Sequence, residues 1–201
     1  MLLPAKPVRK QRVPMEALLV SAGVVALAEI GDKTQLLALL LAARFRAPVP
    51  VILGILTATL ANHLAAGAVG TLLASHIDPQ LLRYLLAASF FATAVWMFIP
   101  DRAPDAAQKP SRFGAYGTTV VAFFLVEIGD KTQLATVALA AKYQMLIPVV
   151  AGTTLGMLLA DVPAVLLGGV AAHRIPVKLV NRIAAAAFLA LGVIVLLHPA
   201  S

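Results

Sequence analysis

Two identical octapeptides, Glu-Ile-Gly-Asp-Lys-Thr-Gln-Leu, place acidic groups inside long apolar runs. The first motif covers residues 29–36, and the second motif, residues 127–134, follows 98 positions later. An ionised side chain near the centre of a bilayer costs several kcal/mol on insertion scales, and is tolerated where it faces a partner or water. The duplicated motifs therefore predict two inward-facing polar surfaces rather than two unrelated defects.

The side chains of the motifs have the chemistry of a divalent-cation site. Carboxylate, amide and hydroxyl oxygens without sulfur suit hard cations such as Mn²⁺ and Ca²⁺, whereas zinc and copper favour imidazole or thiolate ligands. Neighbouring carboxylates also repel one another unless a cation or protons neutralise them, so metal and protons can compete for one site. The predicted metal ligands are Glu29, Asp32, Gln35, Glu127, Asp130 and Gln133.

The spacing within the first motif fits one face of a helix. Successive residues of a helix rotate by about 100°, which puts Glu29, Asp32, Lys33 and Leu36 on one side, with Thr34 elsewhere unless the helix is distorted. Gly31 and its counterpart Gly129 allow either a break or a close helix contact.

Charge balance within each motif offers a simpler, purely structural reading. Glu29 precedes Lys33 by four residues, and Glu127 precedes Lys131 in the same way, so each pair can form a salt bridge along a helix. That reading leaves Asp32 and Asp130 without partners. A second role for the lysines is to replace the metal as internal cations in the empty state.

Further polar residues of the apolar segments extend the candidate site. Asp161 is a fifth acid within such a segment, among nine acidic residues in the chain, and it aligns with His63 in the first half. Trp96, near the end of the third segment, is typical of an anchor at the membrane interface. The predicted supporting or proton-coupled residues are Lys33, Thr34, Lys131, Thr132, Asp161 and His63.

Composition places the whole chain in a membrane. Of its 201 residues 61% are hydrophobic and 12% charged, with a mean hydropathy of +0.93, far from the values of soluble domains. The net charge of +7 comes from basic residues at segment edges, which indicates headgroup anchors rather than nucleic-acid binding. The absence of cysteine excludes disulfides and thiolate metal sites.

Proline, glycine and charged clusters divide the chain into six apolar segments. These are expected near residues 15–43, 49–74, 79–99, 114–141, 147–171 and 177–198. The predicted organisation is a basic N-terminal segment (1–14), a first three-helix repeat (15–99), a linker (100–113) and a second three-helix repeat (114–198). Three crossings per repeat invert the second copy, so the fold class is an all-α polytopic protein of two inverted repeats. The basic residues do not decide the orientation.

At the two motifs the chain resembles the Golgi-type divalent cation/proton antiporters, the Gdt family of calcium and manganese exporters. Two copies of Glu-x-Gly-Asp-(Lys/Arg)-(Thr/Ser) carry the resemblance, here residues 29–34 and 127–132. The resemblance implies export of Mn²⁺ or Ca²⁺ in exchange for protons, with both motifs forming the cation site. It also implies a prokaryotic inner or plasma membrane, because the chain has a short mixed-charge central loop.

The expected function is thus secondary transport by alternating access, without enzymatic activity. The cation is the transported substrate, no cofactor is expected, and the partners are divalent cations, protons and the lipid bilayer, with homo-oligomers left open and nucleic acid excluded. The residues leave two alternatives: an exporter of organic cations such as basic amino acids, and an intramembrane aspartyl protease using Asp32 and Asp130.

Overall fold

The computed structural model describes residues 9–99, 113–167 and 176–197, which form eight α-helices and no strand. The all-helical class is therefore confirmed. The first half contains α1 (Arg9–Glu29), α2 (Lys33–Phe45), α3 (Pro48–His76) and α4 (Pro79–Trp96). The second half contains α5 (Gly114–Glu127), α6 (Lys131–Tyr143), α7 (Leu146–Leu167) and α9 (Val177–Leu197). All of the predicted linker except Phe113, and the chain before Arg9, lie outside the described residues.

Two of the predicted segments are each two helices rather than one. The segment 15–43 is divided between α1 and α2, which are bent by 72° at the break, and the segment 114–141 is divided between α5 and α6. Both breaks fall inside the motifs. The expectation that Glu29, Asp32, Lys33 and Leu36 share one face of a continuous helix is therefore wrong.

Several described helices are suited to a bilayer. Three are long and apolar enough to cross it, namely α3, α7 and α9, and the bent pair α1–α2 adds a fourth candidate. Residues that face outward are largely aliphatic, such as Leu81 and Leu85 on α4 and Leu179 and Ile183 on α9. Lipid is as apolar as these side chains, so such a surface belongs to an integral membrane protein. Six crossings in two inverted repeats stay a prediction.

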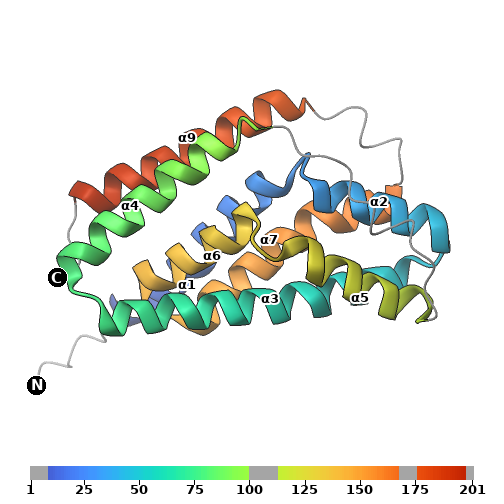
Figure 1. The fold of residues 1–201 in the computed structure, drawn as a ribbon, viewed down its shortest axis with the longest axis horizontal. Coiled ribbons are helices and arrows are strands. Elements are labelled where there is room, and N and C mark those ends of the chain that lie inside the picture. Colours follow the sequence, from blue (N-terminus) through green and yellow to red (C-terminus); the bar gives the residue numbers. More distant parts are fainter. Residues whose placement is uncertain (1–8, 100–112, 168–175, 198–201) are drawn as a thin grey trace, which may run out of the picture.

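The long helices α3 and α7 connect the two halves. Helix α3 packs against α5, α6 and α7, while α7 packs against α1 and α2. Helices α4 and α9 lie side by side along one edge of the molecule (Figure 1), where the rings of Phe90 and Phe188 are 6.4 Å apart. The motif breaks of both halves thus lie among helices contributed by both halves.

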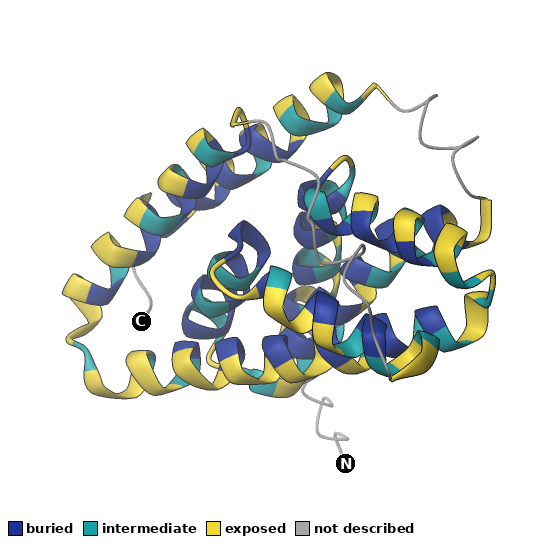
Figure 2. Ribbon diagram, turned by 45° about the vertical axis from the view of Figure 1, so that its right-hand side comes forward, coloured by how far each residue is buried: buried dark blue, intermediate teal, exposed yellow. Residues whose placement is uncertain are grey.

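Small residues allow the helices to approach closely. A Cβ on Gly156 of α7 would lie 2.5 Å from the carbonyl oxygen of Ala22 in α1. A Cβ on Gly70 of α3 would collide with the carbonyl oxygen of Val137 in α6. Contacts between backbones replace the hydrophobic effect as a source of packing energy in lipid. Figure 2 shows the resulting pattern, with buried residues on the inner faces of the helices and exposed residues on the outer faces.

Candidate functional site

A glycine turns the chain at the centre of each motif. Gly31 has a φ of +85° and Gly129 a φ of +77°, a left-handed conformation that only glycine adopts without strain. The turn is closed by the backbone N–H of the following aspartate, which donates to the preceding glutamate carbonyl at 2.9 Å in the first motif and 3.1 Å in the second. The glutamate therefore ends one helix while the aspartate begins the next.

The aspartate of each motif caps the helix that follows. Asp32 accepts a hydrogen bond from the Thr34 N–H at 3.5 Å, and Asp130 accepts one from the Thr132 N–H at the same distance. Such caps satisfy backbone donors that have no partner inside the helix. The positive ends of the α2 and α6 dipoles consequently lie at the acidic residues of the motifs.

The glutamine of each motif bonds the backbone at the break. The Gly31 N–H donates to Gln35 Oε1 at 3.0 Å, and the Gly129 N–H donates to Gln133 Oε1 at 2.7 Å. The Gln35 amide also donates to the Ala160 carbonyl of α7 at 3.0 Å. Through these contacts the glutamines support the backbone at the break. Their role as metal ligands stays a prediction.

Crossed ion pairs join the two motifs. Lys33 Nζ lies 2.8 Å from Asp130 Oδ1, and Lys131 pairs with Asp32. The broken helices explain why the lysines do not follow the pairing of a continuous helix, in which Glu29 with Lys33 and Glu127 with Lys131 would be neighbours. Each lysine instead neutralises the aspartate of the other copy, so the structure brings the motifs into one cluster.

The threonines hold the glutamates. Thr34 Oγ1 donates to Glu29 Oε2 and lies 3.2 Å from Asp32 Oδ2. Thr132 Oγ1 lies 3.3 Å from oxygens of both Glu127 and Asp130. The sequence placed these threonines away from the acidic face unless the helix was distorted, and the glycine break supplies that distortion.

Three carboxylates form a candidate cation site. Glu29, Glu127 and Asp130 are each at most 2% exposed, and one oxygen from each lies within 4.8 Å of the others. Among the described residues, Glu29 Oε1 and Glu127 Oε1 have no hydrogen-bond partner. Buried anionic oxygens without partners are costly, and a hard divalent cation is the ligand that such a donor set suits. We call these three residues the carboxylate triad.

Asp161 and His63 occupy equivalent positions in α7 and α3, and both are fully buried. Within the described part of the chain, neither carboxyl oxygen of Asp161 and neither ring nitrogen of His63 has a hydrogen-bond partner. Neither residue is part of the carboxylate triad. Their supporting or proton-coupled roles stay predictions.

Two cavities lie against the motifs. The larger, of about 460 Å³, is lined by Gly129, Asp130, Gln133 and Ala66, among others, and the smaller, of about 150 Å³, is lined by the equivalent residues of the first motif and by Ala164. Trp96 also lines the larger cavity, although its position in the sequence is that of an interface anchor. Nothing in its spacing relative to the motifs indicates this contact.

The space around Gly31 differs from the space around Gly129. A Cβ on Gly31 would collide with the side chain of Val177 at the start of α9, whereas a Cβ on Gly129 would meet no atom within 4 Å among the described residues. Identical octapeptides therefore have unequal surroundings.

The chain is similar in sequence to known cation transporters. Residues 17–105 and 115–201 match the profile of the family described as "Divalent cation/proton antiporter GDT1". The chain is also 48% identical over 176 residues to a protein of Vibrio cholerae serotype O1 (strain ATCC 39541 / Classical Ogawa 395 / O395) named "Putative manganese exporter". The similarity covers 87% of this chain and 88% of the relative. No solved structure matches the chain. Both descriptions are those of transporters rather than enzymes.

Proposed function

Because this chain belongs to the divalent cation/proton antiporter GDT1 family and is a cation transporter of the membrane, we propose that it exports Mn²⁺ in exchange for protons. The observation that carries the proposal is the carboxylate triad, which combines Glu29 of the first motif with Glu127 and Asp130 of the second. The name of the Vibrio cholerae relative favours Mn²⁺ over Ca²⁺ as the main substrate.

The donor set supports a hard divalent cation. All three groups of the triad are carboxylates, and the chain contains no cysteine that could supply a thiolate. Mn²⁺ accepts carboxylate, carbonyl and water oxygens in an octahedral arrangement, and Ca²⁺ accepts the same atoms in a larger shell. Ca²⁺ is therefore the second candidate substrate.

Exchange of a metal ion for protons follows if both compete for the same carboxylate oxygens. A carboxylate that has released its metal can take up a proton, so one cluster can carry either M²⁺ or about two H⁺ in opposite directions. Exchange requires that the cluster be open to one side of the membrane at a time. The pairing of lysines and aspartates across the two motifs supports a site shared by two inverted three-helix repeats.

The ion pairs also bear on the two alternatives. A membrane aspartyl protease needs two aspartates that share a proton, whereas Asp32 and Asp130 are each engaged by a lysine. An organic ammonium ion would meet two ammonium groups already present beside the acids. The compact carboxylate triad favours a small metal cation over both.

Transport by purified protein in liposomes tests the proposal. The vesicles enclose a pH-sensitive dye, and Mn²⁺, Ca²⁺ or lysine is added outside with and without a proton gradient. We expect Mn²⁺ to enter while the internal pH rises as protons leave, with a smaller response to Ca²⁺. Uptake of lysine without metal flux would support the organic-cation alternative, and absence of both metal flux and pH change would refute the proposal.

A further inference from the structure

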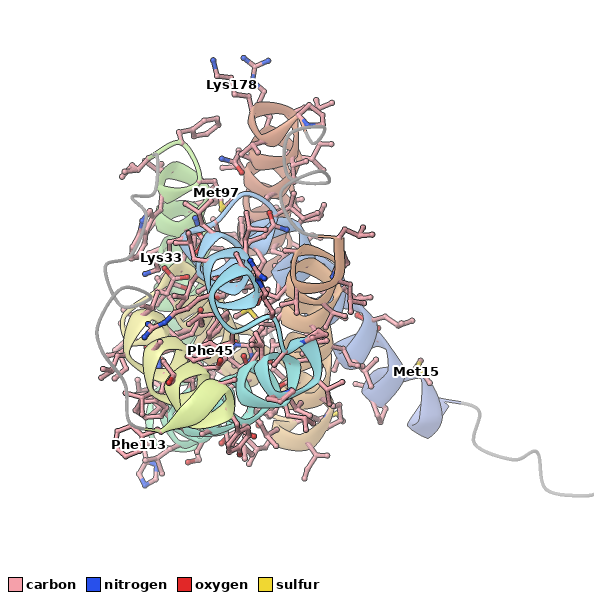
Figure 3. All side chains as sticks on the ribbon, turned by 90° about the vertical axis from the view of Figure 1, so that its right-hand side faces the viewer. Met15, Lys33, Phe45, Met97, Phe113 and Lys178 are labelled. Carbon is pink, nitrogen blue, oxygen red and sulfur yellow. The ribbon has the colours of Figure 1, made fainter. Side chains whose placement is uncertain are left out.

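The two motif lysines have the same sequence context but different environments. The Lys33 side chain is 23% exposed, and that of Lys131 is 3% exposed. Figure 3 shows Lys33 among the helices, in contrast to Lys178, which lies at the outer end of α9. All eight residues of the two motifs are the same. The difference in exposure must therefore come from the parts of the protein that surround each lysine.

Their aspartate partners differ as well. Asp130, the partner of Lys33, supplies an oxygen to the carboxylate triad. Asp32, the partner of Lys131, is not a member of it. A cation bound to the triad thus competes with Lys33 for Asp130, and the pair of Lys131 with Asp32 can persist beside it.

The cavities distinguish the lysines in a third way. Lys33 lines the smaller cavity, while its partner Asp130 lines the larger one. Lys131 lines neither of these two cavities. Both members of the Lys33–Asp130 pair therefore border a cavity, whereas of the Lys131–Asp32 pair only the aspartate does so. Lys33 is the motif lysine with open space beside it.

We propose that Lys33 is a displaceable counter-ion that leaves Asp130 when a divalent cation occupies the triad, while Lys131 stays bound to Asp32 as a fixed support. This inference rests on the proposed function, since it assigns different tasks to the two lysines of the transport site. The ammonium group of Lys33 returns to Asp130 when the cation leaves, which keeps a buried carboxylate from remaining unpaired. The Lys131 side chain is 3% exposed and lines neither cavity, so its ammonium group has less space beside it than that of Lys33.

The two lysines allow a matched comparison in the full-length protein. In Lys33→Gln the cation no longer competes with an ammonium group, so we expect the apparent KM for Mn²⁺ to fall about tenfold, the change produced by about 1.4 kcal/mol. The maximal rate falls too, because nothing helps to expel the cation. Lys33→Arg keeps the charge and is expected to retain a KM near that of the unmodified protein. Lys131→Gln is expected to lower thermal stability without lowering the KM.

A second variant covers the case in which Lys33→Gln does not fold. The chain contains no cysteine, so Lys33→Cys introduces a unique thiol. Aminoethyl methanethiosulfonate restores an ammonium group at this position and is expected to return the KM toward its original value, whereas methyl methanethiosulfonate leaves it low. The matched variant Lys131→Cys is expected to resist both reagents, because its side chain position is buried.

Equilibrium binding of Mn²⁺ separates failure of this inference from failure of the proposed function. If the unmodified protein neither binds nor transports Mn²⁺ or Ca²⁺, the proposed function is wrong. If it transports Mn²⁺ but Lys33→Gln binds the metal no more tightly, or Lys131→Gln tightens binding equally, the division of roles is wrong. Failure of the aminoethyl reagent to modify Lys33→Cys would also overturn it.

Discussion

Lys33 at the start of α2 forms a 2.8 Å ion pair with Asp130 at the start of α6. The two residues are far apart in sequence, yet each belongs to a copy of the same octapeptide. Their contact, together with the reciprocal pair of Lys131 and Asp32, shows that the copies form one cluster.

Removal of a charge from the carboxylate triad should stop transport. We expect Glu29→Gln and Asp130→Asn each to reduce Mn²⁺ flux at least about tenfold, because a cation loses an anionic ligand worth more than 1.4 kcal/mol. Flux into liposomes measures the effect, and thermal unfolding in detergent checks the fold. The control is Glu16→Gln, which changes an exposed acid outside the triad. Near-normal flux in either triad variant would contradict a shared site.

The glycines of the breaks should differ in their tolerance of a methyl group. Gly129→Ala is expected to lower the free energy of unfolding by about 1–2 kcal/mol, which is the strain of a left-handed conformation at alanine. Gly31→Ala should cost more, by about 1–3 kcal/mol of steric strain, because its Cβ collides with Val177. Thermal unfolding of the two variants tests the difference, and Val177→Ala should reduce it in the double variant. Equal stability of the two alanine variants would contradict the described position of α9 over the first break.

The hydroxyl of Thr34 should be needed to position Glu29. Thr34→Val keeps the shape but removes the donor to the glutamate, and a hydrogen bond to a charged group contributes about 1.5–3 kcal/mol. We expect at least about a tenfold weaker affinity for Mn²⁺, measured by equilibrium binding. Thr34→Ser, which keeps the hydroxyl, should bind nearly normally. A valine variant with unchanged affinity would show that this hydrogen bond does not orient the ligand.

Close packing of α1 against α7 should make the stability of the protein sensitive to alanine at Gly156 but not at Gly23. Gly156→Ala is expected to destabilise the protein by about 1–3 kcal/mol, because its Cβ would lie 2.5 Å from the Ala22 carbonyl oxygen. Gly23→Ala in α1 meets no described atom within 4 Å and should stabilise the helix by about 0.5–1 kcal/mol. Thermal unfolding of both variants gives the comparison. A stabilised Gly156→Ala would refute the close approach of the two helices.

The sequence predicted the grouping of the motifs but not their internal geometry. Repetition of Glu29 and Asp32 as Glu127 and Asp130, inside apolar runs, was enough to expect one acidic cluster. Helical spacing also allowed a bridge between Glu29 and Lys33, a pairing that assumes an unbroken helix, although Gly31 allowed a break as well. The left-handed glycine redirects every following side chain, and only the fold specifies where each one goes.

Differences between the copies could not be read from the sequence either. Gly31 and Gly129 have the same neighbours along the chain, yet only the first lies against Val177 among the described residues. The exposure of Lys33 and the burial of Lys131 arise in the same way. Such contacts come from helices distant in sequence, and periodicity says nothing about them. Trp96 is a similar case, because its place in the cavity that Asp130 also lines depends on how α4 packs against α6.

The crossed ion pairs also join the two halves of the chain in the way that an interface joins two subunits. The lysine of each half engages the aspartate of the other half, so each motif depends on the other for an ion pair. A half produced alone would have to find a second half to complete its ion pairs. A charge reversal in one copy is accordingly expected to require a compensating change in the other.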